Sequence, residues 1–107
     1  MPRYISLVSF TEEGYKHIKD TKKRAKAFAD KAKKKGVIIQ ETFWTIGHYD
    51  IVHVFQAPDD SAAASVGFAL GSMGNVRTET LRAFSGDEIE ELLSNAYDMH
   101  LEEGSLR

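Results

Sequence analysis

Four segments of the chain have the composition and the apolar–polar alternation of β-strands. They run from Arg3 to Phe10, from Val37 to Ile46, from Ile51 to Gln56 and from Val76 to Phe84. Only residues 47–50 separate the second segment from the third, and two β-rich segments around so short a connection indicate a β-hairpin. The pattern therefore predicts four strands, of which the middle two pair directly.

Three further segments are predicted to be helices. The first starts at Thr11, which can cap a helix, and stops at Gly36. Its apolar stripe consists of Tyr15, Ile18, Ala25, Phe28, Ala29 and Ala32. The second is capped by Asp59 or Asp60, and the third begins at Ser85. The element order is therefore β-α-β-β-α-β, followed by a terminal helix.

This order predicts an α+β protein with a ferredoxin-like βαββαβ arrangement. Such a fold has an antiparallel four-stranded sheet with helices on one face. Right-handed crossovers place the first and third strands at the centre of the sheet. No linker or repeat interrupts the sequence, so residues 1–107 are predicted to form a single domain.

The hairpin determines which side chains share a face of the sheet. Pairing the strands across Gly47 and Asp50 predicts three cross-strand pairs on one face: Ile46–Ile51, Trp44–His53 and Thr42–Phe55. This face, called the aromatic face below, also contains Ser6, Val8, Thr78 and Thr80. The opposite face is predicted to lie beneath the helices and contains Ile5, Leu7, Phe43, Thr45, Val52, Val54, Leu81 and Ala83. A register shift of one residue would exchange the two faces.

The aromatic face needs a cover, because an exposed patch that contains Trp44 and Phe55 is typical of an interface or a pocket. One layer of helices covers only one side of a four-stranded sheet. We therefore expect a homodimer, or a higher homo-oligomer, in which two sheets face each other and enclose a barrel-like core.

Composition excludes some classes of site. The chain has no cysteine, which excludes disulfides, thiolate chemistry and zinc sites with sulfur ligands. No apolar run approaches the roughly 20 residues of a membrane helix. Residues 1–5 lead directly into a strand without the organisation of a signal peptide. These features predict a cytoplasmic protein with no membrane partner.

The charges are strongly segregated along the chain. All nine lysines and Arg24 lie between Lys16 and Lys35, whereas residues 87–103 contain seven acidic residues and no lysine or arginine. A basic block of this kind can bind phosphate groups. Here the lysines surround a predicted helix, and those at its C-terminal end complement the helix dipole. Because no arginine–aromatic interleaving accompanies them, we favour a solvated helix and predict no nucleic-acid partner.

His53 is the main candidate for chemistry, because imidazole titrates near neutral pH and can act as a general acid or base. The alternative is a packed histidine whose ring bonds to a backbone or threonine partner. Together with His53, the residues predicted to bind a ligand are Ser6, Trp44, Phe55 and Thr78. Neither a metal nor another cofactor is predicted, because different elements carry the four histidines, which are His17, His48, His53 and His100.

The turn Gly47-His48-Tyr49-Asp50 resembles the signature of the GYD-domain proteins, and its Asp50 is expected to satisfy local backbone donors. Similar segments follow at Ala57-Pro58-Asp59, Gly74 to Thr78 and Thr80 to Phe84, so that the resemblance extends from Tyr4 to the third helix. The resemblance implies a ferredoxin-like topology within the dimeric α/β-barrel proteins. That group includes cofactor-independent monooxygenases, muconolactone isomerases, haem-binding chlorite dismutases and the ligand domains of Lrp-type regulators. The shared positions are turn and fold residues, so the resemblance assigns no catalytic residue.

Two classes of function remain open on the sequence alone. The first is a homodimeric module that binds or senses a small apolar or aromatic metabolite in a sheet-lined cavity. The second is a small cofactor-independent enzyme, similar to a monooxygenase or an isomerase, with His53 as acid or base. The first is preferred, because catalysis usually needs several convergent groups and His53 is the single catalytic candidate in the sequence.

Overall fold

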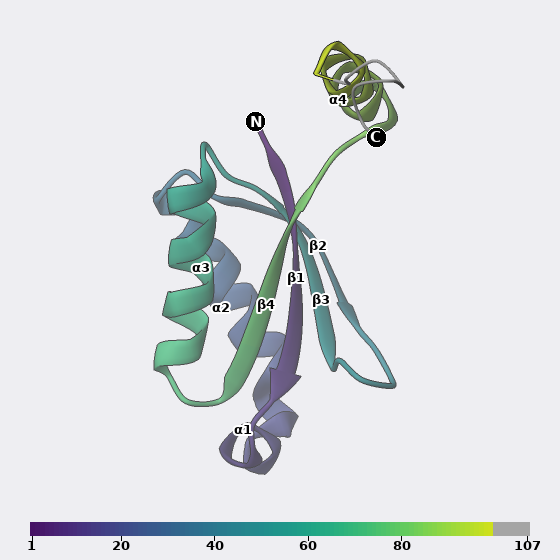
Figure 1. The fold of residues 1–107 in the computed structure, drawn as a ribbon. Helices are drawn as coiled ribbons and strands as arrows, with labels where there is room; N and C mark the ends of the chain where they lie inside the picture. Colours follow the sequence, from purple (N-terminus) through teal and green to yellow (C-terminus); the bar gives the residue numbers. More distant parts are fainter. Residues whose placement is uncertain (100–107) are drawn as a thin grey trace.

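The computed structural model describes residues 1–99 of the chain (Figure 1). Its strands are β1 (Arg3–Phe10), β2 (Ile38–Trp44), β3 (Ile51–Gln56) and β4 (Val76–Ala83). Its helices are α1 (Glu12–Lys16), the 3-10 helix η1 (Ile18–Asp20), α2 (Thr21–Lys34), α3 (Asp60–Ser72) and α4 (Gly86–Asp98). None of these helices has both the length and the apolar character that crossing a membrane requires.

The four strands form one antiparallel sheet in the order β2-β3-β1-β4. Both α2 and α3 lie on the same side of this sheet (Figure 1). The α+β class, the ferredoxin-like order and the central position of β1 and β3 are therefore confirmed. Three predicted helix starts are confirmed as well, because Thr11, Asp59 and Ser85 each accept a hydrogen bond from a backbone N–H in the following turn.

The sequence predicts a single helix between Thr11 and Gly36. In the structure this segment forms α1, η1 and α2 in succession. Gly14 shows why α1 is separate. It packs so closely on β4 that a Cβ there would lie 1.9 Å from the carbonyl oxygen of Asn75. The same carbonyl accepts a hydrogen bond of 3.0 Å from the backbone N–H of Thr11. These contacts fix α1 against the start of β4, and the chain turns before α2 begins.

The hairpin register differs by two residues from the predicted one. Trp44 lies opposite Ile51, and Thr42 lies opposite His53. The predicted pairs Ile46–Ile51, Trp44–His53 and Thr42–Phe55 are therefore wrong. The reason is that β2 ends at Trp44, so the connection spans residues 45–50 rather than a tight turn. A shift of two residues leaves each side chain on its predicted face, because side chains alternate with a period of two.

The aromatic face lies beneath α2 and α3, not on the open side of the sheet as predicted. Its members on the two central strands are buried together with Tyr4; they are Ser6, Val8, Ile51, His53 and Phe55. In the core, Tyr4 and Phe55 pack with side chains of α2 and α3. Both faces of the sheet are rich in apolar residues, so the alternation shows which side chains share a face but not which face the helices cover.

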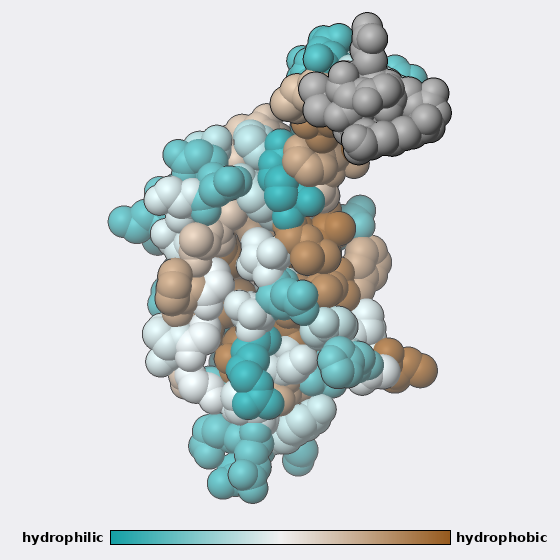
Figure 2. Space-filling model, viewed as in Figure 1, coloured by the Kyte–Doolittle hydropathy of each residue, from teal (hydrophilic) through white to brown (hydrophobic). Residues whose placement is uncertain are grey.

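The face that the sequence predicts to lie beneath the helices is instead the open face of the sheet. Leu7 and Val52 are partly covered by their neighbours, whereas Phe43 and Leu81 are 52% and 41% exposed. Figure 2 shows apolar side chains gathered over the sheet on the side away from α2 and α3. The surface that needs a cover is therefore this open face.

α4 extends away from the rest of the domain (Figure 1). Ser85 and Glu88 form a capping box that stabilises its first turn. Ile89, Leu92 and Leu93 remain exposed along it. The radius of gyration is 17.6 Å, compared with about 13 Å for a compact domain of roughly 100 residues. Within the described chain, the apolar side of α4 is thus only partly covered.

Candidate functional site

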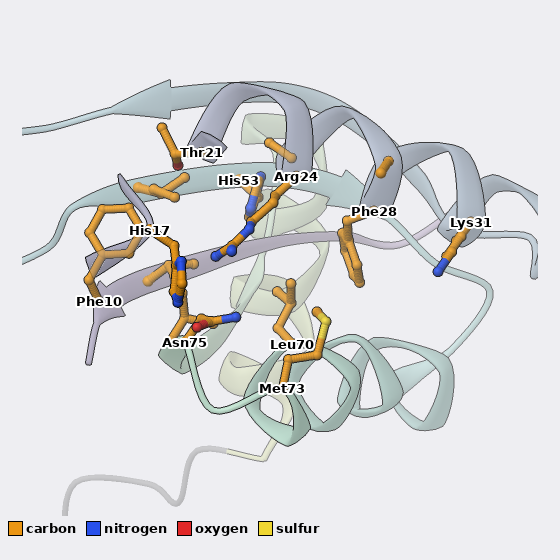
Figure 3. A pocket seen from close by; sticks show the side chains of 15 residues that line it. Phe10, His17, Thr21, Arg24, Phe28, Lys31, His53, Leu70, Met73 and Asn75 are labelled. Carbon is orange, nitrogen blue, oxygen red and sulfur yellow. The ribbon is translucent and has the colours of Figure 1, made fainter. Parts of the chain in front are cut away.

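A cavity of about 360 Å³ lies between the sheet, α2 and α3 (Figure 3). Its volume falls at the small end of the ~300–1,000 Å³ that is typical of ligand pockets. Its apolar wall includes Val8, Phe10, Phe28, Ile51, Leu70 and Met73. Its polar wall consists of His17, Thr21, Arg24, Lys31, His53 and Asn75. The cavity thus combines a large apolar surface with a small set of polar groups.

α2 forms one wall of the cavity, because Thr21, Arg24, Phe28 and Lys31 recur at the spacing of one helical face. Phe28 belongs to the apolar stripe that the sequence predicts. Arg24 and Lys31 belong to the basic block, which we interpreted as solvated, so the sequence analysis missed both as site residues. The signal for Arg24 is its i, i+4 relation to Phe28 and its identity as the one arginine among the lysines.

His53 is the predicted site residue that lines the cavity. It is only 4% exposed, and its Nδ1 lies 2.9 Å from Oγ1 of Thr42 on the neighbouring strand. Burial lowers the pKa of the imidazole below its ordinary value, so the ring is neutral near neutral pH. Within residues 1–99 no group hydrogen-bonds to Nε2, which makes this nitrogen the one available to a ligand.

Ser6 and Phe55, two other predicted ligand residues, lie in the core rather than in the cavity wall. Ser6 is opposite His53 and is fully buried, and its Oγ has no hydrogen-bond partner in the described part of the chain. Phe55 is also fully buried, and its ring stacks on Tyr4 with 5.4 Å between the ring centroids. Neither residue lines the cavity.

Trp44 and Thr78 also lie outside the cavity wall. Trp44 is 44% exposed, and its Nε1 donates a hydrogen bond of 3.0 Å to Oγ1 of Thr21. Because Thr21 lines the cavity, Trp44 connects the edge strand to the cavity wall at this point. Thr78 lies beneath α3, where its Oγ1 would be 3.2 Å from a Cβ added to Gly67. The close approach of α3 to the sheet therefore depends on the small residue at position 67.

The hairpin connection is fixed by three of its residues, which are Gly47, Tyr49 and Asp50. Gly47 has a φ of +114°, a conformation that favours glycine. The hydroxyl of Tyr49 donates a hydrogen bond of 2.7 Å to Oε2 of Glu79 on β4, and this bond raises the pKa of Tyr49. The sequence predicts that Asp50 satisfies local backbone donors. Its carboxylate instead accepts a hydrogen bond from the backbone N–H of Phe10, which is distant in sequence.

Metal binding has no support in the described residues. No group of three or more His, Asp or Glu side chains within residues 1–99 could hold a metal ion. His100, which the sequence analysis considered, lies outside these residues. The Nε2 atom of His17 lies 3.2 Å from Oε1 of Glu13, so this imidazole at the cavity wall has a carboxylate neighbour.

Comparison with known proteins places the chain in a family. The sequence pattern of the GYD domain matches residues 4–93. The chain is also 31% identical over 84 residues to the glutamine synthetase and cystathionine beta-lyase binding protein of Thermus thermophilus, an alignment that covers 78% of this chain and 88% of that protein. No solved structure matches the chain significantly. Because the matched residues extend from β1 into α4, the chain belongs to the GYD domain family.

Proposed function

We propose that this protein is a homodimeric binding module that holds a small apolar or aromatic metabolite between its sheet and its two covering helices. The observation that carries the proposal is the cavity of about 360 Å³ with its mixed apolar and polar wall. Such walls are typical of ligand sites, because the apolar side chains provide affinity and the few polar groups fix the orientation of the ligand. The sheet supplies the floor through Val8, Ile51 and His53.

A metabolite screen tests this function. Native mass spectrometry of the purified protein would detect a ligand that remains bound. A thermal-shift screen would identify further ligands, since a ligand at a hundred times its Kd stabilises the folded state by about 2.7 kcal/mol. Ala25→Phe fills the cavity, whereas Ala64→Phe adds the same ring to an exposed position on α3. We expect ligands to lose affinity for the first variant and not for the second. Ligands that bind both variants equally would place the binding site elsewhere.

A cofactor-independent enzyme with His53 as acid or base is the second candidate. It is favoured by one observation, which is that a neutral imidazole with a free Nε2 borders the cavity. We place it second because catalysis usually needs several convergent groups, and His53 is the one buried titratable residue among the cavity-lining residues of the described chain. His53→Gln should abolish turnover while ligand binding persists if this function is correct. Ligand binding without turnover in the unmodified protein would support the binding module.

We further propose that two copies pair through the open face of the sheet. Phe43 and Leu81 are exposed on this face beside partly covered Leu7 and Val52, and α2 and α3 lie on the other side of the sheet (Figure 1). Contiguous exposed apolar surface of this kind is typical of a protein interface. Pairing through the open face would leave the two cavities on the outer sides of the double sheet, so each copy would keep a complete binding site.

Light scattering of charge variants tests the pairing. Phe43→Glu and Leu81→Glu place a charge in the proposed interface, and both side chains are exposed in the single chain, so the variants should still fold. Ile46→Glu is the matched control, because Ile46 is fully exposed in the hairpin connection. We expect the two face variants to be monomeric and the control to remain dimeric. A monomeric unmodified protein at micromolar concentration would refute the pairing.

A metabolic enzyme is a second kind of partner that we propose. The relative from Thermus thermophilus is named for binding glutamine synthetase and cystathionine beta-lyase. In this chain, α4 offers a surface for such a partner, since Ile89, Leu92 and Leu93 are exposed on a helix that extends from the domain. An exposed apolar helix face of this kind can dock into a groove of another protein.

Binding measurements with the two enzymes test this partner. Purified glutamine synthetase and cystathionine beta-lyase would be presented to the full chain in a surface-binding assay. Leu93→Glu should weaken binding roughly tenfold or more, because it places a charge in the contact. Ser94→Glu adds the same charge to an exposed neighbour on α4 and should have a smaller effect. Failure of both enzymes to bind the unmodified protein would exclude them as partners.

A further inference from the structure

Most polar groups of the cavity gather at one end of it, whereas Lys31 lies at the other (Figure 3). Figure 3 shows His17, Arg24 and Asn75 directed towards one another at the first end, near the ring of His53. Among the residues that line the cavity, Arg24 and Lys31 are cationic and none is an aspartate or a glutamate. A concave surface that carries charge of one sign concentrates ligands of the opposite charge. The cavity wall therefore favours an anion.

Arg24 is the cation that is best placed to bind it. Neither an ion pair nor a hydrogen bond links its side chain to another residue of the described chain. Lys16 and Lys26 differ from it, because each lies 3.5 Å from a carboxylate oxygen of its own helix. A guanidinium presents its donors in a planar fork that matches the two oxygens of a carboxylate. Arg24 is solvent-exposed at the edge of the cavity, and its side chain is directed towards the cavity end (Figure 3), so its unused donors are open to a ligand there.

The charge at this end of the cavity matches a single negative charge. His17 already lies 3.2 Å from Glu13, and burial keeps His53 neutral near neutral pH, so Arg24 supplies the uncompensated charge. A phosphate dianion would need a second cation or several backbone N–H donors at the same place. The other end of the cavity is lined by Phe28, Leu70 and Met73, and the exposed Lys31 lies beyond Phe28 at this end (Figure 3).

We infer that the cavity takes a monocarboxylate with an apolar body of about one aromatic ring, and that Arg24 binds the carboxylate. The ring of Phe28 and the side chains of Leu70 and Met73 contact the body of the ligand. The inference rests on the proposed binding function, because it names the ligand class of the same cavity. The ring of His53 lies near Arg24 (Figure 3), and its Nε2 can accept from, or donate to, a polar substituent of the ligand.

Calorimetric titration with matched probes tests the ligand class. The probes are 3-phenylpropanoate, its neutral amide 3-phenylpropanamide, acetate and phenyl phosphate. We expect the carboxylate to bind roughly tenfold or more tightly than the amide, because the amide lacks the charge that strengthens hydrogen bonds to Arg24. Acetate should bind more weakly than 3-phenylpropanoate because it has no body to occupy the apolar end. Phenyl phosphate should also bind more weakly, because its second charge is not compensated.

Two variants locate the charge that binds the carboxylate. Arg24→Gln should lower the affinity for 3-phenylpropanoate roughly tenfold or more and lower that for the amide much less, because the amide makes only uncharged hydrogen bonds, which the Gln side chain can also donate. Lys23→Gln removes an exposed charge from the same helix outside the cavity and should change neither affinity. Because the Arg24 side chain bonds to no other described residue, Arg24→Gln should retain the melting temperature of the unmodified protein, which shows that the variant folds.

Several results would overturn the inference. Equal binding of acid and amide, lost in Ala25→Phe, would refute carboxylate specificity and leave the proposed binding function intact. Tighter binding of phenyl phosphate would assign the site to phosphate esters instead. Equal losses in the Arg24 and Lys23 variants would reduce the effect to general attraction by a basic helix. If none of the probes binds, the inference fails, and the metabolite screen decides separately whether the cavity holds another class of ligand.

Discussion

The carboxylate of Asp50 accepts a hydrogen bond of 2.8 Å from the backbone N–H of Phe10, across 40 positions of sequence. The backbone N–H of Asp50 donates in turn to the carbonyl oxygen of Val8, also at 2.8 Å. The hydroxyl of Tyr15 donates to the same carboxylate at 3.1 Å, and this bond raises the pKa of Tyr15. Asp50 therefore joins the end of the hairpin to β1 and α1, next to the part of the cavity wall that Phe10 forms.

Asp50→Ala should destabilise the protein, because it leaves the partly buried N–H of Phe10 without a partner. We expect a loss of about 1–2 kcal/mol in the free energy of unfolding, measured with urea. Asp50→Asn should cost less than about 1 kcal/mol, because the amide oxygen still accepts from Phe10. Asp30→Ala is the control: its ion pair with Lys26 is exposed, so the change should stay within about 0.5 kcal/mol.

A catalytic Asp50 would behave differently from an architectural one. Asp50→Asn would then abolish an activity and leave the stability almost unchanged. That outcome would contradict the structural role and make Asp50, rather than His53, the residue that acts on the ligand.

Gly47→Val should destabilise the hairpin connection. The φ of Gly47 is +114°, which a β-branched residue adopts only with strain, and a side chain there would meet no other atom within 4 Å. The cost is therefore one of backbone conformation, about 1–3 kcal/mol by urea unfolding. Gly71→Ala is the contrast, because Gly71 lies in α3 without a positive φ and a Cβ there also meets open space. This change should stabilise by about 0.5–1 kcal/mol. Equal effects at both glycines would contradict the explanation.

The helix starts could be predicted from the sequence because their causes are local. Thr11, Asp59 and Ser85 cap helices through backbone groups only a few residues away, so the residue type and the following turn suffice. The order of the strands followed from the same local patterns and from the handedness of crossovers.

The orientation of the sheet could not be predicted from alternation. Ser6 and His53 occupy the face beneath the helices, where Ser6 is fully buried and His53 borders a cavity with polar groups. Leu7 and Val52 are more apolar but lie on the open face. Alternation shows only which side chains share a face, so it could not reveal that the face with Ser6 and His53 lies beneath the helices while the more apolar face is open.

The place of Arg24 in the cavity wall and the hydrogen bond of Asp50 to Phe10 both depend on residues far away in sequence. The sequence predicts a solvated helix for the basic block around Arg24, and only the fold shows that β3 and α3 lie beside it. The sequence predicts local partners for Asp50, and only the fold shows that β1 lies next to the hairpin. Such contacts arise from the tertiary arrangement, which no local pattern contains.

Gly14→Ala should be the most destabilising single methyl addition among the glycines of residues 1–99. The new Cβ would lie 1.9 Å from the oxygen of Asn75. Because this oxygen belongs to the backbone, no rotation of a side chain can relieve the contact. The change must separate α1 from β4 and break the hydrogen bond between the N–H of Thr11 and that oxygen. We expect a loss of more than about 2 kcal/mol in urea unfolding, since both a steric and a hydrogen-bond term contribute. A loss as small as that of an exposed substitution would show that α1 is not fixed there.

Hydrogen exchange provides a second measurement for Gly14→Ala. The amide of Thr11 should lose protection more than amides of the central strands, because its acceptor is the displaced carbonyl. Uniform loss of protection throughout the sheet would indicate global destabilisation without local detachment of α1.

His53 should make the stability of the protein depend on pH below neutrality. Burial lowers its pKa in the folded state, whereas in the unfolded chain the pKa is about 6.5. Between these two values the unfolded chain binds a proton that the folded protein does not, so stability falls as the pH falls below about 6.5. Above that value the contribution of His53 is fully present. Urea unfolding at a series of pH values should therefore show a decreasing free energy of unfolding in the acidic part of the range.

Two histidine variants separate this effect from other titrations. His53→Asn retains a polar group towards Thr42 and removes the titration, so the decrease below about pH 6.5 should become shallower even if the variant is less stable overall. His48→Asn makes the same substitution on the exposed hairpin connection and should reproduce the pH dependence of the unmodified protein. A carboxylate ligand beside Arg24 would favour the protonated form of His53, so bound 3-phenylpropanoate should reduce the loss of stability at acidic pH. An unchanged slope in His53→Asn would show that another group causes the decrease.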